Sequence, residues 1–177
     1  MKLPDQRDFY QGKFDLDGRS AWRKFGGLTV DQAYEKFCEN PLSCEENFMF
    51  MGNSAFIFYF PVIDKYIREK ELRIAFSDNT YILCVGIELR LEKERRLAAG
   101  ISRLRAKREK PLPAHVHNQI INLCQFILES LESPGVKKTS ADLIIEAGGP
   151  PAPSWFHTFS DIKTVCTNLL VALGGRD

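Results

Sequence analysis

The stretch PAHVHNQIINLCQFILESL, residues 113–131, has the clearest periodicity in the chain. Its apolar side chains recur at intervals of three and four residues, which is the spacing of one helix face. The residues of this seam are Ile120, Ile121, Cys124, Ile127, Leu128 and Leu131. Ser133-Pro134-Gly135 ends the pattern, because proline and glycine disfavour continuation of a helix. The stretch therefore predicts a helix that buries one face.

Two other segments repeat this pattern nearer the ends of the chain. The last helix is predicted to begin near Thr158 or Ser160 and to end at Gly174-Gly175. Its buried face consists of Ile162, Val165, Cys166, Leu169, Leu170 and Leu173. Earlier in the chain, Thr29-Val30-Asp31-Gln32 matches a capping box, which predicts the start of a helix. Asn40-Pro41 marks the end of that helix.

Two further helices are predicted between residues 43 and 70. Ser43-Cys44-Glu45-Glu46 matches a second capping box and opens a short helix through Met51. From Ser54 to about Lys70 the apolar spacing favours a helix that is kinked at Pro61. A short strand over residues 55–60, with a fresh start at the proline, is the alternative.

The remaining segments complete an all-α prediction. Residues 80–96 fit a strand by alternation and a helix by length, and we favour the helix. Residues 1–28 contain several glycines and are predicted to be irregular and packed on the body. Residues 72–77 leave room for one small β element. We therefore expect a compact bundle of five or six helices, with residues 1–177 forming a single domain.

The composition is that of a globular protein, with 44% hydrophobic and 27% charged residues. A formal net charge of +1 gives no global positive field, which disfavours nucleic-acid binding. The most apolar stretch, residues 48–63, is interrupted by polar residues and Pro61, and is too short to span a membrane. The first residues lack the apolar core of a signal peptide. We therefore expect a cytoplasmic protein that does not bind membranes.

The cysteines are expected to be buried, reduced thiols that act as small hydrophobic residues. Their number is odd, none belongs to a C-x-x-C pair, and most have apolar neighbours in the sequence. They are Cys38, Cys44, Cys84, Cys124 and Cys166.

The sequence contains no recognisable catalytic or metal-binding motif. His115 and His117 are two residues apart, so on a helix their rings point away from each other, and only His157 remains as a third histidine. We expect no metal, no cofactor and no enzymatic activity. An enzyme with a site assembled from distant residues is the alternative, and its candidate residues are Cys44, Glu45, Glu46, His115 and His117.

Two charged features are candidate binding surfaces. Asp31, Glu35 and Glu39 recur every fourth residue on the outer face of the first predicted helix, and Glu45 and Glu46 follow soon after. We predict that these five residues bind a protein partner with a basic surface, because complementary charge speeds association and selects partners. The second feature has seven basic residues and one acid between residues 95 and 110, so a nucleic-acid-associated protein is a further alternative. That stretch has no aromatic side chain on which a base could stack.

The stretch AWRKFGGLT, residues 21–29, resembles small bacterial orphan proteins, as does the continuation through Gln32-Ala33-Tyr34 to Asn40-Pro41. The segment Phe58-Tyr59-Phe60-Pro61, with Tyr66 after it, has the same resemblance. Some such proteins are similar to immunity proteins, which neutralise toxins. The resemblance implies a non-enzymatic protein that binds a cognate toxin and blocks its active site. It assigns no functional residue, because immunity proteins share no inhibitory motif.

Overall fold

The computed structural model describes residues 2–10, 15–71, 78–99, 111–133, 148 and 158–174, and every regular element in these ranges is helical. The all-α prediction is therefore confirmed, with eight α-helices in the described residues against the five or six expected. The helices are α1 (Gln6–Phe9), α2 (Leu16–Phe25), α3 (Val30–Glu39), α4 (Pro41–Phe50), α5 (Asn53–Tyr66), α7 (Asp78–Ala98), α8 (Ala114–Leu131) and α10 (Phe159–Ala172). A π-helical turn, Ile67–Glu71, continues α5.

The N-terminal segment contains α1 and α2, so the prediction that residues 1–28 are irregular was wrong. Asp5 and Asp15 act as N-caps of the two helices, and each side chain accepts a backbone N–H of the first turn. Gly18 lies inside α2, where an added Cβ would come within 2.7 Å of the Phe9 carbonyl oxygen. This glycine therefore permits α1 and α2 to pack closely and does not break the helix.

Helix α3 confirms the first predicted capping box, whereas α4 starts earlier than predicted. The backbone N–H of Thr29 donates to the side-chain oxygen of Gln32, and the backbone N–H of Gln32 donates to the Thr29 hydroxyl oxygen. The second capping box was wrong, because Asn40 caps α4 and accepts the Ser43 N–H at 3.2 Å. Pro41 then occupies the first helical turn, where its missing N–H costs nothing.

Helix α5 lies at the centre of the N-terminal half and confirms the predicted helix over the alternative strand. Pro61 lies inside this helix and is exposed to solvent. The other side of α5 is buried, and Tyr59 is fully enclosed. The hydroxyl of Tyr59 donates to the carbonyls of Phe25 and Leu28 at 2.7 and 2.8 Å, which holds the connection between α2 and α3.

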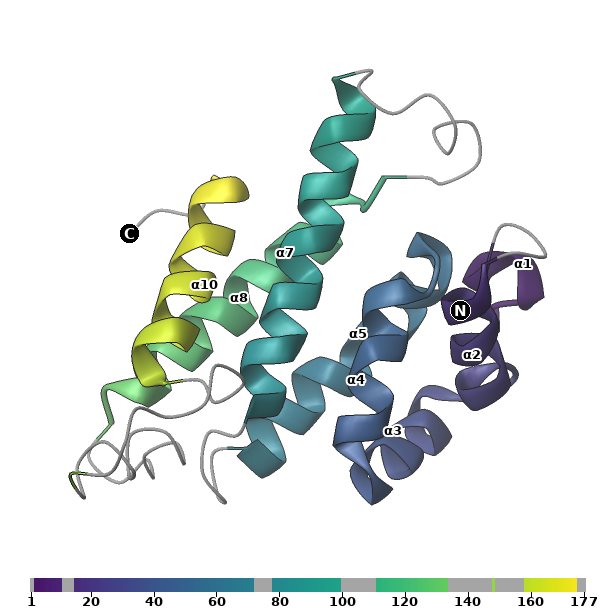
Figure 1. Ribbon diagram of the computed structural model, residues 1–177, viewed down its shortest axis with the longest axis horizontal. Coiled ribbons are helices and arrows are strands. Elements are labelled where there is room, and N and C mark those ends of the chain that lie inside the picture. The colour runs from purple at the N-terminus through teal and green to yellow at the C-terminus, as the bar shows by residue number, and fades with distance from the viewer. Residues whose placement is uncertain are drawn as a thin grey trace.

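Helix α7 joins the two halves of the molecule. Figure 1 shows it running between α10 on one side and α4 and α5 on the other. Helix α8 packs against α10. The helical interpretation of residues 80–96 is confirmed, as are the helices predicted to end at Leu131 and to begin after Thr158. The β element suggested at residues 72–77 lies outside the described residues.

Arg90 fixes α7 to the end of α4. It is only 4% exposed, and its Nη2 donates to the carbonyls of Phe48, Met49 and Met51 at 2.9, 3.1 and 2.7 Å. Its Nη1 donates to Asn53 Oδ1. The last carbonyls of a helix lack partners within the helix and carry partial negative charge, so a buried guanidinium satisfies them effectively.

The same network extends to the start of α8. Asn53 donates through Nδ2 to Glu94 at 2.7 Å, and Glu94 also accepts the backbone N–H of Leu112 at 2.9 Å. These bonds connect helices that are far apart in the sequence. No described helix is long and apolar enough to cross a membrane.

Candidate functional site

Helix α3 presents a line of three carboxylates to solvent. Asp31, Glu35 and Glu39 are all exposed, whereas Ala33 and Phe37 on the opposite side are fully buried. The period of the helix therefore separates acids from core as the sequence predicted. Whether this line binds a partner stays a prediction.

The three carboxylates of α3 differ from Glu92 on α7 in their ion pairing. Among the residues that the structure describes, none of the three forms an ion pair, whereas Glu92 pairs with Arg95 and Arg96 on α7. Like charges one helical turn apart repel each other by a few tenths of a kcal/mol.

Contacts of Tyr34 and Phe37 hold α3 in place against the rest of the protein. Tyr34 donates its hydroxyl to Glu69 at 2.8 Å, and Lys65 Nζ lies 4.2 Å from the centre of the Tyr34 ring. Burial and the bond to Glu69 raise the pKa of Tyr34, so its hydroxyl stays protonated and keeps donating. On the buried side, Phe37 meets the Tyr66 ring edge-on at 4.8 Å between centroids. The carboxylates are therefore displayed on a fixed support.

Helix α4 adds an exposed stripe, of which the sequence prediction included only Glu46. Leu42, Glu46 and Phe50 follow each other at intervals of four residues, and all three are exposed. Leu42 and Phe50 are 64% and 46% accessible. The stripe starts three residues after Glu39, across the Asn40 cap. We use the name α3–α4 face for the exposed residues of these two consecutive helices: Asp31, Glu35, Glu39, Leu42, Glu46 and Phe50.

Glu45 does not belong to this face, which corrects its prediction as a partner-binding residue. It is only 7% exposed and lies between α4 and α7. One residue along a helix turns the side chain by about 100°, so Glu46 points outward where Glu45 points inward. The sequence alone did not distinguish these neighbours.

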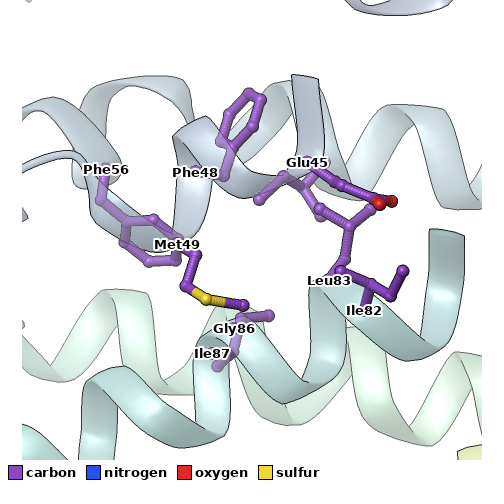
Figure 2. A pocket seen from close by; sticks show the side chains of 9 residues that line it. Glu45, Phe48, Met49, Phe56, Ile82, Leu83, Gly86 and Ile87 are labelled. Carbon is purple, nitrogen blue, oxygen red and sulfur yellow. The ribbon is translucent and has the colours of Figure 1, made fainter. Parts of the chain in front are cut away.

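The space beside Glu45 is an apolar crevice and not a ligand site. Figure 2 shows Glu45 at one end and the side chain of Met49 directed at Gly86 on α7. Phe48, Phe56 and Leu83 also line it. The crevice is too narrow to admit a water molecule. It has no room for a substrate or a cofactor.

The residues considered for an enzyme lie on two helices, α4 and α8. Cys44 is buried in α4, and burial raises the pKa of its thiol against the opposing effects of Ser43 and Lys24. His115 and His117 lie in the first turn of α8 instead. In the described ranges no three potential ligands are close enough to bind one metal ion. His157 lies outside those ranges.

The basic stretch is described only at its beginning. Arg95 and Arg96 are exposed at the end of α7, and both pair with Glu92, at 3.6 and 2.8 Å. The other basic residues of the stretch, at positions 103–110, lie outside the described residues.

Comparison with models of known families, with curated proteins and with solved structures found no match for this chain. Its function is therefore argued from its own surface chemistry.

Proposed function

We propose that this protein is a non-enzymatic binding module that contacts a protein partner through the α3–α4 face. The observation that carries the proposal is the combination of exposed carboxylates on α3, which form no ion pair within the described ranges, with two exposed apolar side chains on α4. Binding sites for proteins commonly join apolar anchors to a polar, charged rim. The α3–α4 face has both parts on neighbouring helices.

The partner that fits this face has a basic surface with shallow apolar depressions. Leu42 and Phe50 would enter the depressions, and Asp31, Glu35 and Glu39 would meet Lys or Arg side chains. Charge complementarity acts mainly on the association rate, whereas packing of apolar anchors acts mainly on dissociation. The two parts of the face therefore have separable roles.

We further propose that the partner is a bacterial toxin and that this protein is its immunity protein. The resemblance of residues 21–41 and 58–66 to small bacterial orphan proteins supports this class. A toxin that acts on nucleic acid presents a basic cleft, and an acidic face on a rigid helix is a suitable plug for such a cleft.

The test compares three tagged forms of the protein in the organism that encodes it. The first is wild type, the second carries Asp31→Lys, Glu35→Lys and Glu39→Lys, and the third carries Leu42→Ala and Phe50→Ala. All changed side chains are exposed, so the melting temperature should move little. Cross-linking and mass spectrometry should show one partner that is lost with the charge-reversed form. With the purified partner, charge reversal should slow association and the alanine pair should speed dissociation.

A matched control separates the position of the charges from their number. Asp17→Lys, Glu129→Lys and Glu132→Lys change the net charge equally at exposed sites on other surfaces. This form should bind like wild type. Equal binding by the charge-reversed form and wild type contradicts the α3–α4 face as the contact. Production of the partner alone should arrest growth and co-production should restore it; without arrest, the immunity role fails and binding stands.

A further inference from the structure

Three cysteines from three helices meet in the interior of the C-terminal half. Cys84 lies on α7, Cys124 on α8 and Cys166 on α10, and each is at most 1% exposed. The sulfur atoms of Cys84 and Cys166 are 3.9 Å apart. The Cys124 thiol, on the third helix, also lowers the pKa of Cys166. Cys166 is therefore the thiol that both other cysteines influence.

The other two cysteines have different surroundings. Cys44 is near Ser43 and the Lys36 carbonyl, and Cys38 is only partly buried on α3. All five thiols are free. The three clustered sulfurs do not converge closely enough to ligate one metal ion. The chemistry open to them is thiol–disulfide chemistry.

We propose that hydrogen peroxide, or another small hydroperoxide, converts Cys84 and Cys166 into a reversible disulfide that ties α10 to α7. The reduced sulfurs are in contact, and an S–S bond of about 2.05 Å requires them to approach by roughly 2 Å. Rotation of the two side chains, with a small shift of the packed helices α7 and α10, would have to supply this movement. Only a small, neutral oxidant can reach sulfurs so deeply buried.

The reaction begins at one sulfur of the Cys84–Cys166 contact, and hydrogen bonding within the cluster lowers the pKa of the Cys166 thiol. Its thiolate attacks one peroxide oxygen, the O–O bond breaks, and a sulfenic acid forms while the other oxygen leaves as water after taking up the thiol proton. Cys84 sulfur then attacks the sulfenic sulfur, and the S–O bond breaks to release a second water. Two thiols lose two electrons, and one peroxide becomes two waters.

Cys124 provides a second position for the disulfide. Its thiolate can attack the oxidised Cys166 sulfur and release Cys84, which moves the crosslink from the α7–α10 pair to the α8–α10 pair. In either arrangement α10 becomes covalently attached to the helix beneath it. The packing of the last described helix would thus respond to oxidants.

The test is oxidation of the wild-type protein with hydrogen peroxide, followed by unfolding and alkylation of the remaining thiols. Mass spectrometry of the digest should identify a Cys84–Cys166 crosslink, and two thiols should be lost in total. Closing a long loop should raise the melting temperature by roughly 5 to 15 °C, and dithiothreitol should reverse the shift.

Variants assign the roles. Cys166→Ala should abolish the crosslink and the stabilisation, whereas Cys84→Ala should divert it to Cys124–Cys166. Cys44→Ala, a buried thiol outside the cluster, should leave it unchanged. An oxidised wild-type protein with neither crosslink, or with an unshifted melting temperature, overturns the proposal. Because that result needs only the wild-type protein, it stands even if a variant fails to fold.

Discussion

At the scale of single residues, two polar side chains inside the core decide how helices meet. Tyr59 holds the connection between α2 and α3 through its hydroxyl, and Arg90 holds the end of α4 through its guanidinium. Both are enclosed by apolar neighbours, so each lost hydrogen bond leaves a buried group without compensation from water. Their positions near the centre explain why α3 and α4 present a fixed surface.

Tyr59 should make the stability fall at alkaline pH. Burial raises its pKa from 10.0 to about 12, so the folded state holds the proton more tightly than the unfolded state. The stability that this raised pKa contributes is fully present below pH 10 and is lost as pH rises from 10 through 12. In that range the free energy of unfolding falls by at most about 1.4 kcal/mol per pH unit.

Tyr59→Phe should cost about 1 to 2 kcal/mol at neutral pH, because two carbonyls lose a donor. It should also flatten the alkaline decline. Urea unfolding at a series of pH values, followed by circular dichroism, measures both effects. Tyr34 also has a raised pKa, but its hydroxyl donates to Glu69 at an exposed position. Tyr34→Phe therefore serves as the comparison variant for Tyr59→Phe. An alkaline decline as steep in Tyr59→Phe as in wild type contradicts the assigned role.

At the scale of elements, glycines and caps fix where helices start and how closely they pack. Gly18 and Gly86 both lie inside helices, yet their surroundings differ. A Cβ at Gly18 would meet backbone of α1 at 2.7 Å, whereas a Cβ at Gly86 would meet only the Met49 side chain, at 3.5 Å and beyond. The first distance forbids a methyl group without movement, and the second is ordinary contact.

Two alanine substitutions should therefore act in opposite directions. Gly18→Ala should destabilise the protein by about 1 to 3 kcal/mol, because α1 must move away from α2. Gly86→Ala should stabilise it by about 0.5 to 1 kcal/mol, because alanine loses less backbone entropy in a helix and contacts Met49. Chemical denaturation of both variants beside wild type measures the difference. Effects of the same sign would contradict the packing described around one of the two glycines.

At the scale of the whole molecule, the buried residues of all helices form one hydrophobic cluster. It runs from Phe9 on α1 to Leu170 on α10, and α7 contacts both α4 and α10. A continuous core couples distant helices, because unfolding one exposes the apolar surface of the next. The single-domain prediction was made from the length and helical pattern of the chain, and it stays a prediction.

Unfolding of the two halves should therefore coincide. In a Trp155→Phe form, Trp22 on α2 is the remaining tryptophan and reports on the N-terminal half. Its fluorescence, the far-ultraviolet circular dichroism and the exposure of the Cys166 thiol should share one urea midpoint. Separate midpoints for Trp22 and Cys166 would show two folding units instead.

The sequence by itself determined the helical class and the limits of α3, α8 and α10. These follow from interactions within one or two turns, such as the Thr29 cap and the apolar seam of residues 120–131, and a local pattern records local interactions. It also located the acids of α3, because helical period alone places them opposite Phe37. Of the two acids predicted on α4, Glu46 is exposed and Glu45 is buried.

Only the tertiary structure decided which side of a helix is covered. Glu45 is buried and Leu42 and Phe50 are exposed because of where α7 lies against α4, and no local pattern specifies that arrangement. The same holds for Gly18, whose role depends on α1, and for Cys84 and Cys166, which are 82 residues apart in sequence. Hydrophobic burial is not directional, so a sequence shows which side chains avoid water but not which partner will cover them.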